Sequence, residues 1–448
     1  MDELKELEIL EMINKKQYQQ LKRELAEMNE VDIAELLDPL DQHTTLLLFR
    51  MLPKDLASEV FAHFSSDQQS SIVHAATDKE LTHILDELFF DDMIDMIEEM
   101  PANLVNKILI NSSQEERKLI NQFLKYPVDS SGSIMTIEYV DLKQNMTVKE
   151  AMSHIKNIGL NRETIYTCYV TNKNRVLEGI VSLRKLVIAD EDAIIKDLME
   201  DDIIYVNTHD DQETVGNIFT KYGFMALPVV DNENRLTGII TFDDILDVIE
   251  QEATEDFQRM AAMAPSEDKY LDTKVFTLAK QRIPWLMLLM IGATITGGII
   301  SRFEDILSNV VVLTAFIPML MDTAGNSGNQ SSTLIIRGLA IGEVTLADKW
   351  KVLWKESRIS IVSGSILASV NFLKNMFIDG VGLKVSLTVS VTLVFTVMLA
   401  KIIGGMLPLG AKKLNLDPAI MAGPLITTLV DGLALIVYFS IASILLNL

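Results

Sequence analysis

A single carboxylate lies inside the last long apolar segment of the chain. Residues 419–448 carry no Asp, Glu, Lys, Arg or His apart from Asp431. A charge at the centre of a membrane helix costs about 2.5–3.5 kcal/mol on insertion scales, so such a residue normally faces a partner or a water-filled path. Thr428 lies three residues before Asp431, on the same helical face, and Pro424 lies seven residues before it. Two oxygen-bearing side chains on one face suit a hard cation or its water shell; a structural pairing of Asp431 with Lys401 is the alternative.

A second group of oxygen-bearing side chains follows the apolar run 306–321. Residues 322–333 are rich in amides, hydroxyls and glycines, with Asn326 and Asn329 near the centre, and they contain neither His nor Cys. Such groups do not face lipid, so they line a pore or form close helix contacts through the small residues. An oxygen-rich set without soft ligands disfavours Zn²⁺ and Cu⁺ and favours Mg²⁺, Ca²⁺ or Mn²⁺.

Carboxylates are also dense in the segment that precedes the first apolar run. Seven of them fall within fourteen positions, namely Asp243, Asp244, Asp247, Glu250, Glu252, Glu255 and Asp256. So many like charges destabilise a fold at low cation concentration and stabilise it once cations bridge them, which is the behaviour of a switch. A second acidic run, at residues 86–99, includes Asp91 and Asp95. A solvated helix surface is the alternative interpretation of both runs.

Charge is divided unevenly between the two halves of the chain. Residues 1–270 carry 53 acidic and 25 basic side chains and residues 271–448 carry 10 and 14, so the net charges are −28 and +4. An acidic surface of this size repels nucleic acid.

The chain has no P-loop and no Ser/His/Asp or Cys/His arrangement for nucleophilic catalysis, so we expect neither an ATPase nor another enzyme. Cys168 is the only cysteine, which excludes an intrachain disulfide.

Apolar segments of membrane-spanning length begin at residue 283. The runs are 283–300, 306–321, 359–373, 385–409 and 419–448, and with their flanks they approach the roughly 20 residues that a helix needs to cross a bilayer. The polar N-terminus has no signal-peptide core, so we expect the front half in the cytoplasm. Five spans then place ten basic residues on inner segments and three on outer loops, as the positive-inside rule requires. This predicts a multi-pass protein of the inner (plasma) membrane with its C-terminus outside.

Residues 136–250 contain an imperfect repeat of strand, turn, strand and helix. Gly179 and Gly238 stand at matching positions, 59 residues apart. The repeat resembles a tandem CBS pair, a regulatory α/β module that often binds adenosine nucleotides. Thr241 and Asp244 in the second copy match that family's ribose-binding T-x-x-D motif, whereas the first copy has Lys185 at the position of the Asp. The resemblance therefore implies at most one site for a nucleotide such as ATP.

The segment before the repeat is predicted to be helical throughout. Loops are expected at Pro53 and Pro101, and the segments between them have the length and pattern of short stacked helices. The predicted organisation is an all-α N domain at 1–128, a tandem CBS pair at 129–250, a connecting helix at 251–280 and a five-helix membrane domain at 281–448.

This order of domains resembles the MgtE family of bacterial Mg²⁺ channels over nearly the whole chain. The motifs that carry the resemblance are residues 282–286 (Arg-Ile-Pro-Trp-Leu), 325–330 (Gly-Asn-Ser-Gly-Asn-Gln), and 417–419 (Asp-Pro-Ala), which leads to Pro424 and Asp431. The resemblance implies a homodimer in the lipid bilayer, with the second and fifth spans lining a pore on the twofold axis. It also implies that Asp431 is the selectivity carboxylate and that Asp417 lies near the cytoplasmic mouth.

The resemblance further implies how such a pore is closed. The connecting helix would be the family's plug, and Mg²⁺ bound between the N domain, the CBS pair and the plug would hold the pore shut when cytoplasmic Mg²⁺ is high. The implied ligands are Asp91, Asp95, Asp243, Asp244, Asp247, Glu250, Glu252, Glu255 and Asp256. Two alternatives stay open: an importer of Co²⁺ or Mn²⁺ that Mg²⁺ regulates, and a membrane-anchored cation or nucleotide sensor that does not transport.

Overall fold

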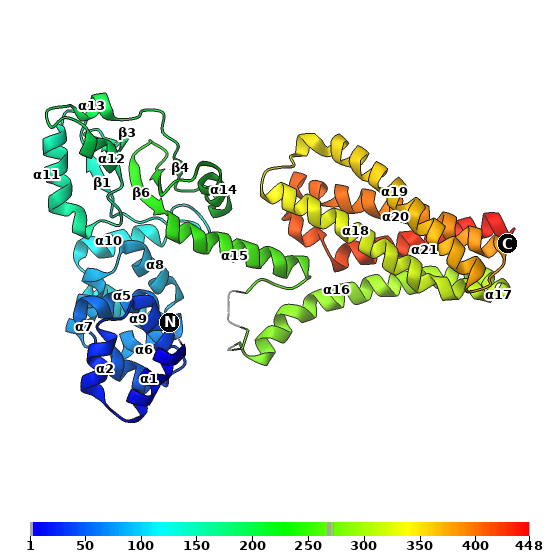
Figure 1. Cartoon of the computed structure of the whole chain (residues 1–448), viewed down its shortest axis with the longest axis horizontal. Helices are drawn as coiled ribbons and strands as arrows, with labels where there is room; N and C mark the ends of the chain where they lie inside the picture. Colours follow the sequence, from blue (N-terminus) through cyan, green and yellow to red (C-terminus); the bar gives the residue numbers. More distant parts are fainter. Residues whose placement is uncertain (1–2, 267–269, 272, 448) are drawn as a thin grey trace. The chain divides into compact units, whose positions relative to one another are not determined.

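The chain folds into two compact units, Met1–Ile249 and Glu250–Leu448. The computed structural model (Figure 1) describes residues 3–266, 270, 271 and 273–447. Each unit is considered on its own below.

The N-terminal unit begins with helices only. Within the described residues these are α1 (Glu3–Asn14), α2 (Tyr18–Leu25), α3 (Glu30–Leu37), α4 (Gln42–Phe49), α5 (Lys54–Ala62), α6 (Ser66–Ala75), α7 (Asp78–Glu87), α8 (Phe90–Glu99), α9 (Ala102–Asn111) and α10 (Gln114–Phe123). Pro53 and Pro101 are the N-caps of α5 and α9, because proline interrupts one helix and suits the start of the next. Thr77 and Ser113 close capping boxes at the starts of α7 and α10. The predicted all-helical N domain is confirmed.

Two three-stranded sheets follow, and they repeat one another. The first contains β1 (Val140–Leu142), β2 (Thr167–Thr171) and β3 (Leu177–Ser182), and the second β4 (Val206–Asn207), β5 (Ala226–Val230) and β6 (Leu236–Thr241). In each sheet the first pair of strands is parallel and the second antiparallel. Gly179 pairs with Val170 and Gly238 with Val229, so the two glycines occupy equivalent positions. The tandem repeat is therefore confirmed.

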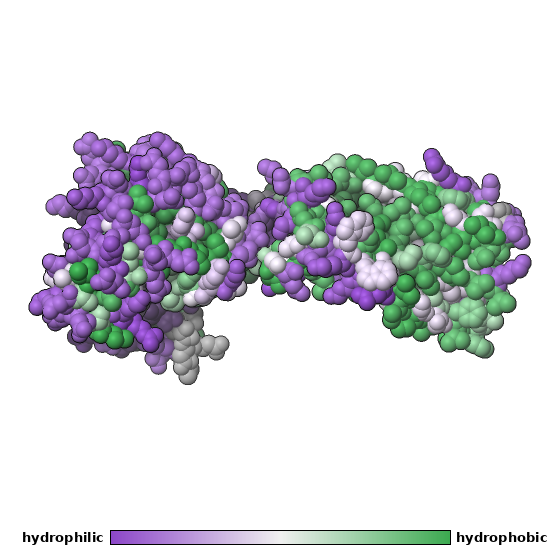
Figure 2. All heavy atoms as spheres, turned by 90° about the horizontal axis from the view of Figure 1, so that it is seen from above, coloured by the Kyte–Doolittle hydropathy of each residue, from purple (hydrophilic) through white to green (hydrophobic). Residues whose placement is uncertain are grey.

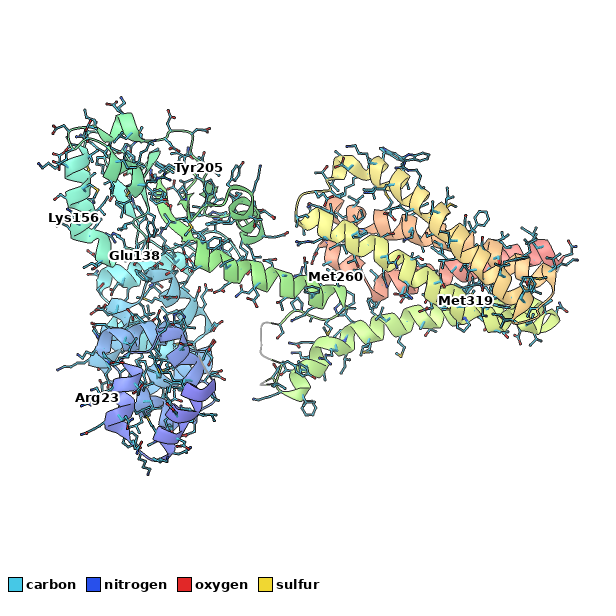
Figure 3. All side chains as sticks on the ribbon, in the orientation of Figure 1. Arg23, Glu138, Lys156, Tyr205, Met260 and Met319 are labelled. Carbon is cyan, nitrogen blue, oxygen red and sulfur yellow. The ribbon has the colours of Figure 1, made fainter. Side chains whose placement is uncertain are left out.

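Short helices cover these sheets, and a longer one leaves the second. They are α11 (Val148–Ile158), η1 (Gly159–Asn161), α12 (Leu183–Ile188), α13 (Ile195–Leu198) and α14 (Gln212–Tyr222). Helix α15 (Phe242–Met260) starts directly after β6. The connecting segment expected at 251–280 is thus not one helix, because α15 ends at Met260 (Figure 3) and the next helix begins at Val275.

Long helices make up most of the C-terminal unit. They are α16 (Val275–Arg302), α18 (Ile317–Ala340), α19 (Lys349–Phe377), α20 (Leu383–Lys413) and α21 (Pro424–Leu446), joined by α17 (Glu304–Asn309), η2 (Val311–Phe316), η3 (Leu346–Asp348) and η4 (Pro418–Met421). In the described part of the chain, three helical segments are long and apolar enough to cross a membrane: α16, α20, and η4 with α21. Much of the face of this unit that Figure 2 shows is hydrophobic, and Leu286, Ile291 and Ile295 of α16 are exposed.

The second long helix differs from the predicted one. The apolar run 306–321 was expected to be the span, with residues 325–330 after it, but α18 begins at Ile317 and carries residues 325–330 in its interior. Pro318 suits the first turn of a helix, where its missing N–H leaves no bond unmade. The small side chains then allow close packing: a Cβ added to Gly404 of α20 would collide with the backbone of Gly328. Hydropathy alone therefore misplaced this helix.

Candidate functional site

Asp431 lies on α21, where that helix touches α18. Its side chain is half-buried, and its Oδ1 atom is buried without a hydrogen-bond partner among the described residues. A Cβ added to Gly325 of α18 would lie 3.8 Å from this oxygen and would collide with Thr427. Glycine at position 325 thus lets the backbone of α18 reach the carboxylate. A buried carboxylate oxygen without a donor is available to a cation or its water.

The two threonines before Asp431 face different neighbours. Thr428 donates its hydroxyl to the Pro424 carbonyl at 2.8 Å and turns its methyl group towards Gly292 of α16. Thr427 donates its hydroxyl to the Gly423 carbonyl at 2.7 Å and shares the Gly325 contact with Asp431. The structure thus brings Thr427, rather than the predicted Thr428, to the same α18 residue as Asp431.

The amides of α18 extend this polar surface by one turn. Asn329 has a buried Oδ1 atom with no partner among the described residues, and Asn326 is exposed. Lys401 of α20 is only 6% exposed and donates to Gln330 Oε1 at 3.4 Å. Across the described residues no ion pair joins Lys401 to Asp431, so the structural pairing that the sequence left open is not observed.

Glu356 of α19 is a buried acidic residue that sequence reasoning missed. It is 5% exposed and accepts a hydrogen bond from Ser331 of α18 at 2.6 Å. Gly405 of α20 leaves room for it, because an added Cβ there would lie 3.0 Å from Glu356 Cγ. The predicted third apolar run starts at residue 359, and so it excluded Glu356, although α19 begins ten residues earlier, at Lys349.

Asp417 joins the end of α15 to the start of the last span. Its carboxylate accepts a hydrogen bond from the backbone N–H of Ala419 at 2.7 Å, which caps η4. It also accepts from the guanidinium of Arg259, which in turn pairs with Glu255. Burial and the charge of Asp417 raise the pKa of Asp256, while Arg259 and Arg337 oppose that rise. Two predicted ligands, Glu255 and Asp256, are therefore brought together with Asp417, the residue predicted at the cytoplasmic mouth of the pore.

Gly423 permits a close approach between the same two segments. Its φ angle is +51°, a left-handed conformation that side chains rarely adopt. A Cβ added there would also collide with the carbonyl oxygen of Met260, the last residue of α15. The end of α15 and the residue before α21 are therefore in direct backbone contact.

A second acidic group lies inside the N-terminal unit, between α8 and the start of α15. Asp91 is 8% exposed, and burial followed by the charges of Asp244, Asp92 and Glu163 raises its pKa well above the usual value. Burial likewise raises the pKa of Asp244, with Asp243 and Asp247 adding to the effect. This places the predicted residues Asp91 and Asp244 in one electrostatic cluster.

Three further acids belong to this cluster. Burial is the largest cause in each case: it raises the pKa of Asp92 to about 6, that of Asp95 to about 7 and that of Glu163 to about 8. Glu138, labelled in Figure 3, adds negative charge at Asp92 and Glu163. Asp92, Glu138 and Glu163 were not among the predicted ligands. Asp92 lies in the acidic run 86–99, whereas Glu138 and Glu163 come close to it only through tertiary packing.

The remaining predicted ligands are spread along α15. Asp243, Asp247 and Glu250 are exposed, on the side of the helix away from Ile245 and Val248, which are buried. Glu252 is partly buried. Among residues 3–266, 270, 271 and 273–447, no three His, Cys, Asp or Glu side chains are already gathered closely enough to hold a metal ion. The acids therefore form a region of unfavourable charge that cations would relieve, not a preformed coordination shell.

Comparison with known proteins identifies the chain. Family models match the MgtE intracellular N domain at residues 28–129, a CBS domain at 195–251 and MgtE, described as a divalent cation transporter, at 317–441. The chain is 35% identical to "Magnesium transporter MgtE" of Thermus thermophilus over 95% of both chains, and 32% identical to the Bacillus subtilis protein of that name over 92% of this chain and 93% of the relative. The chain belongs to the MgtE family. This is a family of transporters and not of enzymes, as expected.

Solved structures agree with this assignment for the soluble part. The soluble part of a magnesium transporter matches with a TM-score of 0.52 and 30% identity, over 56% of this chain and 99% of that one. The cytosolic domain of the Mg²⁺ channel MgtE in complex with ATP matches with a TM-score of 0.52 and 32% identity, over 54% and 99%.

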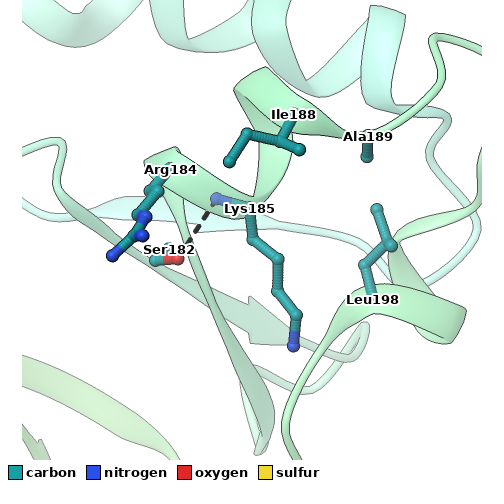
Figure 4. Close-up of a pocket in the computed structure, with 6 residues that line it drawn as sticks. All are labelled: Ser182, Arg184, Lys185, Ile188, Ala189 and Leu198. Atoms are coloured by element: carbon teal, nitrogen blue, oxygen red, sulfur yellow. Dashed lines mark hydrogen bonds between the residues drawn. The ribbon is translucent and has the colours of Figure 1, made fainter.

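The two nucleotide-motif positions of this MgtE protein differ in structure. In the second CBS copy, Thr241 donates its hydroxyl to Asp244 Oδ2 at 2.5 Å, so the two motif residues contact each other. In the first copy, a cavity of about 330 Å³ is lined by Ser182, Arg184, Lys185, Ile188, Ala189 and Leu198 (Figure 4). There Lys185, which pairs with Glu200 at 3.1 Å, stands where the motif has Asp.

Proposed function

We propose that this protein is a Mg²⁺ channel of the cell membrane that is closed by Mg²⁺ bound on its cytoplasmic side. The observation that carries the proposal is Asp431, a carboxylate within an apolar helix whose buried oxygen has no partner in the described residues. Such a residue needs water or a cation at its side. Gly325 of α18 brings backbone close to that oxygen, so a hydrated ion there would meet one charge and several neutral oxygens.

Mg²⁺ is the ion that the surroundings and the relatives favour. The described α18 and α21 offer hydroxyl, amide, carbonyl and carboxylate oxygens, and their sequences contain neither His nor Cys. Mg²⁺ gives up its water reluctantly and is commonly held through it. The curated relatives are called magnesium transporters. Transport of Co²⁺ or Mn²⁺ under regulation by Mg²⁺ is the alternative, because these ions accept the same ligands.

Five spans and an outer C-terminus are part of the proposal. Helices α18 and α19 are 24 and 29 residues long, which gives about 36 and 43 Å at 1.5 Å per residue, enough to cross a bilayer. Their polar side chains lower the mean hydropathy, but several are buried inside the unit, namely Ser327, Ser331, Ser332, Ser360, Asn371 and Asn375. Lipid-facing side chains of both helices can therefore be apolar.

A homodimer would complete the pore. Thr296 is the only buried residue of α16, and most of the exposed residues of this helix are apolar. Such a helix needs lipid or a second copy of the chain against it. Two copies related by a twofold axis would present two Asp431 carboxylates to one ion path.

Closure is assigned to the acidic residues of the soluble part and α15. The raised pKa values of Asp92, Asp95 and Glu163 show that negative charge is unfavourable where α8 meets the CBS pair. Mg²⁺ bound there would neutralise that charge and favour the closed arrangement over others. Glu255 and Asp256 near Asp417 would couple the end of α15 to the mouth of the pore.

No chemical energy is needed for inward flow. A membrane potential of 100 mV, negative inside, makes the inward movement of a divalent cation favourable by about 4.6 kcal/mol of free energy. A passive channel therefore suffices, and ATP, which a related cytosolic domain binds, would act as a regulator at the CBS pair.

The decisive experiment is Mg²⁺ flux into proteoliposomes. Asp431→Asn removes the charge with little change in volume and is expected to abolish flux while the protein stays folded and of unchanged size in detergent. Undiminished flux would overturn the assignment of the pore.

Competition with Co²⁺ and Mn²⁺ in the wild-type protein separates the ion alternatives. Replacing Asp243, Asp244, Asp247 and Glu250 by their amides is expected to keep flux high at millimolar cytoplasmic Mg²⁺.

A further inference from the structure

A second acidic residue of α18, Asp322, is exposed within the hydrophobic part of the C-terminal unit. Its side chain has neither a hydrogen bond nor an ion pair with the residues that the structure describes, and its neighbours Leu320 and Met321 are buried or partly buried. An ionised carboxylate at this depth cannot face lipid without a large cost. It must face water, a cation or another chain.

The helix places Asp322 on the same face as the contact with α21. Asp322 lies three residues before Gly325, so the two share a face and differ by less than one turn. Gly325 is the residue whose added Cβ would lie 3.8 Å from Asp431 Oδ1. Asp322 therefore lies less than one helical turn from the residue at which α18 approaches the Asp431 carboxylate.

The nearby basic side chain does not neutralise this pair. Lys401 bonds to Gln330, eight residues beyond Asp322 on α18, a rise of about 12 Å. Helix dipoles favour acids in the first turn, but Asp322 is the sixth residue of α18 and the first turn of this helix holds no acid. Neither a salt bridge nor helix capping therefore accounts for Asp322.

We propose that Asp322 is a second carboxylate of the ion path, less than one helical turn from Gly325 and on the outer side of Asp431, where it sets the affinity with which divalent cations enter. The inference rests on the proposed function, including the outer C-terminus, because it takes Asp431 as the pore carboxylate. Asp322 attracts the hydrated ion from the external solution and, with Asp431, holds it through its water shell. Two carboxylates favour a divalent over a monovalent cation, since their mutual repulsion is relieved best by the higher charge.

The test compares three variants by initial Mg²⁺ flux into proteoliposomes as external Mg²⁺ is varied. Asp322→Asn is expected to raise the half-saturating Mg²⁺ concentration at least about fivefold, most strongly at low ionic strength, while the maximal flux falls less. Asp322→Glu keeps the charge and is expected to stay near wild type. Asp305→Asn, an exposed acid of α17 outside the ion path, is the matched control and is expected to change neither value.

Each outcome bears on one claim. An unchanged half-saturating concentration in Asp322→Asn, with Asp431→Asn inactive, would overturn the role of Asp322 and leave the proposed pore intact. Full activity of Asp431→Asn would overturn the pore itself. An equal rise in Asp305→Asn would show that general surface charge, not Asp322, attracts the cation. Size-exclusion profiles of all variants verify folding, and a misfolded Asp322→Asn leaves Asp322→Ser as the neutral variant to be scored by the same criterion.

Discussion

Arg259 donates a hydrogen bond to Asp417, and this pairing links the end of α15 to the loop that leads into the last span. The two residues are 158 positions apart in the chain. Arg259 also pairs with Glu255, one turn earlier on α15. The guanidinium of Arg259 therefore pairs with two carboxylates, Glu255, which the sequence predicts to bind a cation, and Asp417, which it predicts at the pore mouth.

This pairing predicts that the positive charge of Arg259, like bound Mg²⁺, favours the closed state of the pore. Arg259→Gln removes the positive charge and leaves Glu255, Asp256 and Asp417 facing one another, so like charges would push α15 from the pore mouth. We expect half-closure to need several-fold more cytoplasmic Mg²⁺. Patch recording with Mg²⁺ varied on the cytoplasmic side measures this.

The charge-conserving variant is the control for that prediction. Arg259→Lys keeps a cation but loses the forked geometry that suits a carboxylate, so it should lie between wild type and Arg259→Gln. An Mg²⁺ dependence of closure that is identical in all three proteins would show that the pairing has no part in gating.

The acidic cluster of the N-terminal unit predicts a specific pH dependence. Asp92, Asp95 and Glu163 have folded pKa values of about 6, 7 and 8, whereas such acids titrate near 4 when unfolded. Between these limits the folded state binds more protons than the unfolded one, so its stability falls as pH rises from about 4 to about 8. Without divalent cations, the melting temperature of a fragment of residues 1–266 should drop by several degrees over this range.

Mg²⁺ should reverse much of that fall. A bound cation replaces the protons that the acids lose, and its stabilising effect should therefore be larger at pH 8 than at pH 5.5. The triple variant Asp92→Asn, Asp95→Asn, Glu163→Gln keeps the buried acids Asp91 and Asp244, so its melting temperature is expected to fall less with pH than that of the wild type and to respond less to Mg²⁺. A wild-type fragment that melts at one temperature from pH 5 to pH 8 in EDTA would refute this account.

Much of the fold could be predicted from local sequence signals. Pro53 and Pro101 mark helix starts, and the matching glycines Gly179 and Gly238 mark the repeat. The resemblance to the MgtE family was also visible in the sequence and is confirmed. Asp431 stood out because a lone carboxylate in an apolar helix has a cost that no local feature offsets.

What escaped prediction depends on contacts between distant segments. Helix α18 was misplaced because Gly and Ser side chains, which lower hydropathy, allow its backbone to pack against α20. Glu163 joins Asp91 and Asp244 only when the CBS pair and α8 fold together. Burial of Glu356 depends in the same way on three helices. Periodicity and composition do not reveal such contacts between distant segments.

The close approach of α18 and α20 predicts a severe effect of adding one methyl group. Gly404→Ala would place a Cβ against the backbone of Gly328, which cannot give way as a flexible side chain would. Overpacking of this kind costs about 1–3 kcal/mol or more. We expect a lower melting temperature in detergent together with reduced flux.

Gly297 provides the matched control for this substitution. It lies in α16, and a Cβ added there meets nothing within 4 Å. Gly297→Ala should be neutral or slightly stabilising, because alanine favours a helix by about 1 kcal/mol. Equal melting temperatures of the two variants would contradict the close packing of α18 on α20.

The buried bond between Ser331 and Glu356 predicts that α19 holds the pore helix α18 in place. Glu356→Ala leaves a cavity beside Gly405 and removes the acceptor of the 2.6 Å bond, so flux and stability should both fall. Glu356→Gln keeps an acceptor of the same size and should restore most of both. Because Glu356 acts through Ser331 and not on the ion, the half-saturating Mg²⁺ concentration should stay unchanged in Glu356→Gln. A rise in that value like the one expected for Asp322→Asn would instead place the Glu356 carboxylate in the ion path.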